Sequence, residues 1–220
     1  MSLGRLSHLQ TRVLRLLADV RPRWTLTGGG ALAGVHTQHR ETRDLDLFWR
    51  SGEQLGDLPR KVVSLLKFDG LAVDTIQSAP AFLRLHVSAG GDTVILDLVA
   101  DPVAVVEHPV EFVVEGATIL VDTRHEILVS KLCTLLERSE LRDLQDVRIL
   151  LETGGELDRA LRESPLKDAG FSPLTLAWLL RQFPLSALAL ASGLSAEETA
   201  SVGTFRDELV QRITAIASPE

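Results

Sequence analysis

The pattern of apolar and polar positions predicts two kinds of structure in successive parts of the chain. In the first part, stretches with apolar residues at helical spacing alternate with short runs of apolar and β-branched residues. The predicted helices are 3–19, 31–35 and 53–67, and the predicted strands are 24–27, 45–49, 71–76, 82–87, 93–99, 111–114 and 117–121. This part is therefore expected to adopt an α/β fold.

The pattern changes near Asp122, after which no run of residues has a convincing strand pattern. Thr123 with Glu126 has the spacing of a capping box that opens a helix, and so has Ser195 with Glu198. The helical stretches predicted in this part are 127–136, 142–152, 156–162, 173–181 and 196–217. We therefore expect two domains, one over residues 1–122 and an all-helical one over residues 123–220.

The most informative stretch combines a glycine cluster with two acidic residues. Gly28–Gly30 lies between a predicted strand and a predicted helix, where backbone amides can approach a phosphate, although glycines at such turns also serve steric needs. Asp44 and Asp46 lie two positions apart in an apolar run, so in a strand they project from the same face. Adjacent carboxylates repel each other unless a positive charge joins them. The combination predicts a Mg²⁺–nucleotide site.

A third carboxylate is offered by Asp97, the single charged residue in the apolar run 94–99. A buried carboxylate without a partner is unfavourable, so Asp97 must be paired, bound to metal or placed at a strand edge. It is a candidate third metal ligand beside Asp44 and Asp46. The alternative is a structural ion pair with an arginine such as Arg43 or Arg84.

The helical part contributes candidate cations. Lys131 lies in the first predicted helix of this part and Arg138 follows seven residues later, a spacing that places both on one face. Lys131 could neutralise charge on a triphosphate, as cations do in phosphoryl transfer. The alternative is a salt-bridged helix pair, for example through Arg142 and Asp146. Spacing alone leaves both interpretations open.

The cysteine and histidine residues bear on whether the chain forms disulfides and whether it binds zinc. Cys133 is the single cysteine, so no intramolecular disulfide can form, as is typical of a reducing cytosol. Its position inside a helical pattern predicts a small core residue. His36 and His39 have a spacing that could hold zinc, but no third ligand is evident nearby.

Composition sets the remaining limits. The 220 residues are 45% hydrophobic, which is enough for a packed core, and the formal net charge of −7 argues against a general nucleic-acid coat. The N-terminal residues carry arginines and lack the apolar core of a signal peptide. The longest apolar stretch, 174–180, is too short to span a bilayer. We therefore expect a cytoplasmic protein with no membrane partner.

Two blocks of residues resemble the AbiEii/AbiGii-type nucleotidyltransferases, the toxin components of bacterial type IV toxin–antitoxin and phage abortive-infection systems. The first block is Thr27–Ala33 followed by His39–Phe48, which contains the Asp44-Leu45-Asp46 motif. The second is Glu126–Leu132, continuing through Arg138 to Arg142–Val147. The acidic motif alone is unspecific, whereas both blocks in this order are fairly specific.

The resemblance implies a DNA polymerase β-like nucleotidyltransferase fold, with a mixed sheet flanked by helices and an all-helical C-terminal domain. It implies Mg²⁺ as cofactor and an NTP as substrate. The residues that it places at the site are Gly28 and Gly29 for the triphosphate, Asp44, Asp46 and Asp97 for metal, Lys131 for phosphate, and Asp143 or Asp146 from the helical domain. Many relatives have Gly-Ser where this chain has Gly28-Gly29, so one possible hydroxyl contact to phosphate is missing here.

The sequence therefore leads to one main hypothesis and two rivals. The main hypothesis is Mg²⁺-dependent transfer of a nucleotide from an NTP to an acceptor hydroxyl, with tRNA as the acceptor and an antitoxin protein as a cognate partner. The first rival is the same chemistry on a small molecule, as in aminoglycoside nucleotidyltransferases, which the net charge of −7 favours. The second is an inactive protein that binds a nucleotide or a partner, against which the intact Asp44, Asp46 and Lys131 argue.

Overall fold

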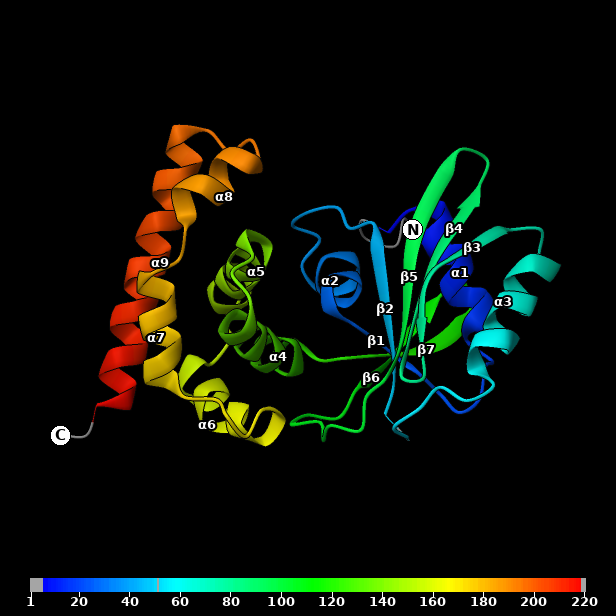
Figure 1. The fold of residues 1–220 in the computed structure, drawn as a ribbon, viewed down its shortest axis with the longest axis horizontal. Helices are drawn as coiled ribbons and strands as arrows, with labels where there is room; N and C mark the ends of the chain where they lie inside the picture. The colour runs from blue at the N-terminus through cyan, green and yellow to red at the C-terminus, as the bar shows by residue number, and fades with distance from the viewer. Residues whose placement is uncertain (1–5, 51, 219–220) are drawn as a thin grey trace. The chain divides into compact units, whose positions relative to one another are not determined.

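A computed structural model describes residues 6–50 and 52–218 of the chain (Figure 1). The chain divides between Thr123 and Arg124 into two compact units, next to the boundary expected from the sequence. All seven strands of the described residues belong to the first unit, and the described residues of the second unit are helical or irregular. The expected class, an α/β part with a mixed sheet followed by a helical part, is confirmed.

The described residues of the first unit form the sheet and three α-helices. Its helices are α1 (His8–Leu17), α2 (Gly28–Ala31), which continues as the π-helical turn η1 (Leu32–His36), and α3 (Leu58–Phe68). Its strands are β1 (Thr25–Thr27), β2 (Asp44–Trp49), β3 (Ala72–Ala79), β4 (Phe82–Ala89), β5 (Asp92–Ala100), β6 (Val110–Val114) and β7 (Ala117–Val121).

The second unit is built from α4 (Arg124–Glu137), α5 (Leu141–Glu152), α6 (Leu157–Lys167), α7 (Pro173–Arg181), α8 (Leu185–Ala191) and α9 (Ala196–Ala217). Ser172 caps α7 by accepting a hydrogen bond from the Thr175 amide. The capping box expected from Ser195 and Glu198 opens α9. Figure 1 shows α7 running beside α9, and these two helices pack against each other.

The strands form one mixed sheet in the order β3-β4-β5-β2-β1-β7-β6. Strand β2 pairs in parallel with β5 and antiparallel with β1, while β4 pairs antiparallel with β5. The registers place Thr27, Asp46, Asp97 and Arg84 directly opposite one another across β1, β2, β5 and β4. Because paired residues project from the same face, these four side chains form one row across the sheet, which we call the acidic row after its two carboxylates.

The core lies on the opposite face of the sheet. Leucines at alternate positions of the central strands, including Leu26, Leu45, Leu47 and Leu96, are fully buried. Helix α1 adds its own buried apolar residues and packs beside α3, as Figure 1 shows. The face that carries the acidic row therefore stays more open than the leucine face, which the alternating burial of β2 reflects.

Most expected elements are confirmed, with ends that shift by a few residues, and three helical regions differ. Helix α3 begins at Leu58 rather than at residue 53, because Gly56 has a φ of +55° and Pro59 favours a helix start there. Helix α6 continues past Pro165 to Lys167, beyond the expected end at residue 162. Helix α8 was not predicted, since seven residues give too short a pattern. The expected start of the first helix, residues 3–5, lies outside the described residues.

Among the described residues, no single helix is long and apolar enough to cross a membrane. The consecutive helices α7 and α8 meet the length and composition requirement only together, and they are bent by 67° at the break between them.

Candidate active site

The acidic motif lies in β2, which has alternating burial along its whole length. Leu45, Leu47 and Trp49 are buried, whereas Asp44 and Asp46 are partly exposed on the other face. The two carboxylates therefore share a face, as expected from the spacing. This is the arrangement that two ligands of one cation require.

Gly28 lies directly against Asp46. A Cβ atom built on Gly28 would come within 2.4 Å of the Asp46 Oδ2, so any side chain would displace the carboxylate. Gly28 also has a φ of +58°, which residues with a side chain rarely adopt. The glycine thus creates the space in which Asp46 sits, and it connects β1 to α2 at the same point.

Gly29 faces the loop that precedes β2. The position of its absent Cβ lies 3.2 Å from the Arg40 Nη2 and 3.2 Å from the Thr42 Oγ1. The Arg40 Nη1 donates to the Glu41 main-chain oxygen at 3.2 Å. A guanidinium and a hydroxyl therefore lie beside the glycine turn, two polar groups that the sequence did not single out as site residues.

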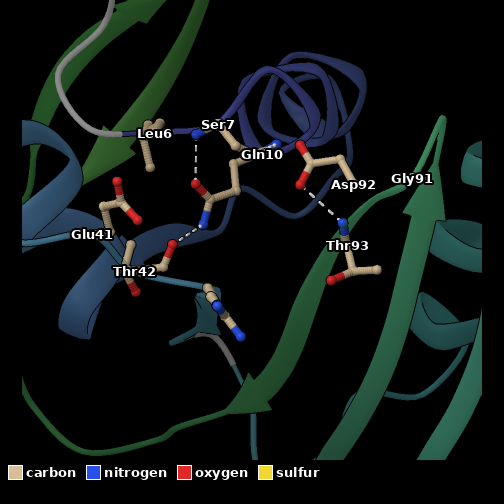
Figure 2. A pocket seen from close by; sticks show the side chains of 9 residues that line it. Leu6, Ser7, Gln10, Glu41, Thr42, Gly91, Asp92 and Thr93 are labelled. Atoms are coloured by element: carbon tan, nitrogen blue, oxygen red, sulfur yellow. Dashed lines mark hydrogen bonds between the residues drawn. The ribbon is translucent and has the colours of Figure 1, made fainter.

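Gln10 holds the same loop from the other side (Figure 2). The buried Gln10 side chain accepts from the Ser7 amide at 2.7 Å and donates through Nε2 to the Thr42 main-chain oxygen at 2.9 Å. This links helix α1 to the residue two positions before Asp44. A cavity of about 630 Å³ opens here, lined by Leu6, Ser7, Gln10, Glu41, Thr42, Arg43, Gly91, Asp92 and Thr93.

Asp97 is paired with Arg84. The Arg84 Nε donates to Asp97 Oδ1 at 2.8 Å and Nη2 donates to Oδ2 at 2.6 Å, a bidentate pair across neighbouring strands. The Arg84 guanidinium also lies over the Phe82 ring, 5.6 Å from its centroid. Of the two interpretations of Asp97, the structure therefore contains the ion pair with Arg84 that the sequence left open.

Three nearby carboxylates act on Arg84. Its hydrogen bonds to Asp97 raise the pKa of the Arg84 guanidinium, partial burial opposes this, and the negative charges of Asp97, Asp44 and Asp46 raise it further. The carboxylates of the motif are thus close enough to stabilise a positive charge at this end of the row.

Asp44 and Asp46 fit two ligands of a divalent cation, because both project from one face and Gly28 leaves a recess for the Asp46 carboxylate. Asp97 is not placed as a third ligand in this structure, because both of its carboxylate oxygens accept hydrogen bonds from Arg84. In keeping with this, residues 6–50 and 52–218 hold no group of three or more His, Cys, Asp or Glu side chains placed to hold a metal ion.

The two histidines near the motif have hydrogen-bond partners of their own. The His36 Nε2 lies 2.7 Å from the Asp122 main-chain oxygen at the end of β7. The His39 Nδ1 lies 2.6 Å from the Thr37 hydroxyl. Both contacts hold the connection between η1 and β2 in place.

Arg50 forms an unpredicted network where β2 ends. It pairs with Asp101 at 3.0 Å and with the fully buried Asp122 at 2.8 Å, and it lies over the Phe48 ring. This network joins the ends of β2, β5 and β7. The residues were not predicted as a group, because their positions are far apart in the sequence.

In the second unit, Lys131 lies between two buried carboxylates. Its Nζ is 2.6 Å from Asp143 Oδ1 and 2.9 Å from Asp146 Oδ2, and the Arg138 Nε donates to Asp143 Oδ2 at 3.0 Å. Burial lowers the pKa of the Lys131 ammonium, but the charges of Asp146 and Asp143 and their hydrogen bonds outweigh this and raise it. The cluster fixes α4 against α5, as in the salt-bridge alternative, although through Lys131 rather than Arg142.

Comparison with known protein families gives a result over most of the chain. Residues 12–211 match the family described as the nucleotidyl transferase AbiEii toxin of type IV toxin–antitoxin systems. The chain belongs to the AbiEii family. It is therefore a nucleotidyltransferase by family, as the resemblance implies. No curated protein matches its sequence.

Solved structures support the fold of this AbiEii family member. A Helicobacter pylori protein provisionally assigned as a nucleotidyltransferase is similar with a TM-score of 0.55, at 19% identity over 97% of this chain and 100% of its own. The Helicobacter pylori protein JHP933 has a TM-score of 0.55, at 18% identity over 94% of this chain and 92% of its own. An antigenic nucleotidyltransferase-like protein from Paracoccidioides brasiliensis has a TM-score of 0.53, at 14% identity over 90% of this chain and 98% of its own.

Proposed function

We propose that the chain transfers a nucleotide from an NTP to a hydroxyl of tRNA in a Mg²⁺-dependent reaction, as the toxin of a toxin–antitoxin pair. The observation that carries the chemistry is the placement of Asp44 and Asp46 on one face of β2, with the Asp46 carboxylate in the recess of Gly28. A cation held there would neutralise the triphosphate and lower the pKa of the acceptor hydroxyl.

The chain's own groups are assigned further roles in this proposal. The glycine turn allows backbone amides of Gly28 and Gly29 to approach phosphate oxygens without a side chain in the way. Asp97 either supplies a third ligand or accepts the acceptor proton, and both roles require it to leave Arg84. Lys131, with Asp143 or Asp146, contributes charge from the helical unit in this proposal, because this segment resembles the family's helical motif.

The test compares the wild type with Asp46→Asn in an assay with labelled NTPs, Mg²⁺ and total tRNA. We expect the variant to lose transfer by about a thousandfold or more, because one ligand and its charge are removed from the site. The control is Asp74→Asn on β3, which removes an exposed carboxylate of the same unit. Equal labelling by wild type and Asp46→Asn would refute the proposal.

A small hydroxylated acceptor is the second candidate, and the net charge of −7 favours it because an acidic chain attracts RNA weakly. Transfer to a small compound in the absence of RNA would identify this substrate class. Failure to bind any NTP with Mg²⁺ in calorimetry would instead favour the inactive binding protein. Co-purification with an antitoxin encoded beside the gene would test the partner.

A further inference from the structure

Asp46 and Asp97 are paired on neighbouring strands, and their carboxylates contact different residues. They are paired across the parallel strands β2 and β5, where strands lie about 4.8 Å apart. The Asp46 carboxylate lies against Gly28 on the side of β1. The Asp97 carboxylate is held by Arg84 on the side of β4. Two side chains at directly paired positions thus lie against different neighbours, Asp46 against Gly28 and Asp97 against Arg84.

Arg84 is well placed to hold Asp97. Its two donors engage both carboxylate oxygens, and the Phe82 ring on the same strand supports the guanidinium. The Asp97 side chain is only 7% exposed, whereas the Arg84 side chain is 43% exposed. The arginine therefore has access to solvent and can move away, while the carboxylate remains in the row.

We propose that Arg84 is a positioning residue that withholds Asp97 from the cation site, so that Asp97 joins Asp44 and Asp46 only when Arg84 releases it. The inference rests on the proposed function, which supplies a cation at Asp44 and Asp46. A guanidinium and a divalent cation repel each other, so sharing one carboxylate is unfavourable. Cation binding and the Arg84–Asp97 pair consequently oppose each other.

The first test measures Mn²⁺ binding to the whole chain by electron paramagnetic resonance, without nucleotide. We expect Arg84→Gln to bind Mn²⁺ about tenfold more tightly than the wild type, since it removes the competing cation and frees Asp97. Arg84→Lys keeps the charge and should stay within about threefold of the wild type. Arg60→Gln is the matched control, because it removes an exposed arginine from α3 and should leave the affinity unchanged.

The double variant Arg84→Gln/Asp97→Asn separates release of Asp97 from a general charge effect. We expect it to lose the gain in affinity, because the freed ligand is gone. A gain that persists in the double variant, or equal affinities of Arg84→Gln and wild type, would overturn the inference. If Asp46→Asn no longer binds Mn²⁺ but Arg84→Gln binds it with the affinity of the wild type, the inference about Arg84 is wrong and the proposed function stands. If the wild type binds no Mn²⁺, both the inference about Arg84 and the proposed function are wrong.

A measurement on the wild type covers the case in which Arg84→Gln does not fold. The Arg84 Nε–H group gives a signal in nitrogen-15 NMR spectra. This signal is assigned by comparison with Arg84→Lys, in which it is absent. We expect saturating Mg²⁺ to shift this signal and speed its exchange with water, because the hydrogen bond to Asp97 Oδ1 is lost. A signal that Mg²⁺ leaves unchanged would overturn the inference.

Discussion

Gly28 shows how much one residue can determine at a site. Its φ of +58° lies in the region that favours glycine, and its missing side chain makes room for the Asp46 carboxylate. Either property alone would constrain the position. Together they explain why a glycine stands where the chain leaves β1 and why Asp46 can occupy its observed place. Arg84 has a comparable effect at the other end of the row, since it sets the direction of Asp97.

We expect Gly28→Ala to reduce transfer by about a hundredfold, because the new Cβ displaces the Asp46 carboxylate and such displacements at a reacting centre have effects of this size. The matched control is Gly116→Ala, whose φ of +85° imposes similar strain but whose Cβ would meet nothing within 4 Å. Gly116→Ala should lose about 1 to 2 kcal/mol of stability in urea unfolding, because a residue with a Cβ is unfavourable in the left-handed region. Gly28→Ala should lose at least as much, because its Cβ also meets Asp46. Similar loss of transfer in both would contradict the assigned role of Gly28.

At the scale of elements, buried charges hold helices and strands in fixed relation. Arg50 joins the ends of β2, β5 and β7 through Asp101 and Asp122. In the helical unit, Lys131 joins α4 to α5 through Asp143 and Asp146, whose side chains are almost completely buried. Such groups tolerate burial only as a set, because removal of one partner leaves an uncompensated charge. The segment that resembles the family's helical motif therefore has a structural role independent of catalysis.

We expect Lys131→Met to lower the free energy of unfolding by about 3 kcal/mol, because it removes the cation between two buried carboxylates. Far-UV circular dichroism in urea would measure the change. Lys61→Met on the exposed face of α3 removes the same charge and should change stability by less than about 0.5 kcal/mol. An equally small effect of both variants would show that the Lys131 cluster does not stabilise the unit.

At the scale of the whole molecule, the family match extends over residues 12–211 and so includes both units. Each unit has its own buried core. The three tryptophans are distributed between them, with the buried Trp24 and Trp49 in the first unit and the 57% exposed Trp178 in the second. Fluorescence can therefore report on the unit that carries the acidic row, provided that Trp178 is replaced.

In a Trp178→Phe background, we expect Mg²⁺ with an NTP at a hundred times its dissociation constant to stabilise the fluorescence transition by about 2.7 kcal/mol, since the ligand binds only the folded form. Adding Asp46→Asn should abolish this stabilisation. If the nucleotide stabilises both proteins equally, its site does not involve Asp46.

Local patterns determined the elements and the candidate motif. Alternation in residues 45–49 predicted that Asp44 and Asp46 share a face, and capping residues placed the start of α9 correctly. These features depend on neighbours within a few positions, so the sequence contains all the information needed. Helix α8 and the late start of α3 were missed, because short or glycine-interrupted patterns carry a weaker periodic signal.

Only the tertiary structure decided how distant residues combine. The sequence left Asp97 as a possible metal ligand or a partner of Arg43 or Arg84, and the register of β4 against β5 selected Arg84. The contact of Gly28 with Asp46 likewise depends on the pairing of β1 with β2. Register is a property of the assembled sheet, and a shift by one residue would send these side chains to the opposite face. The sequence therefore determined which charged residues form the row, whereas the strand register of the sheet determined which of them contact one another.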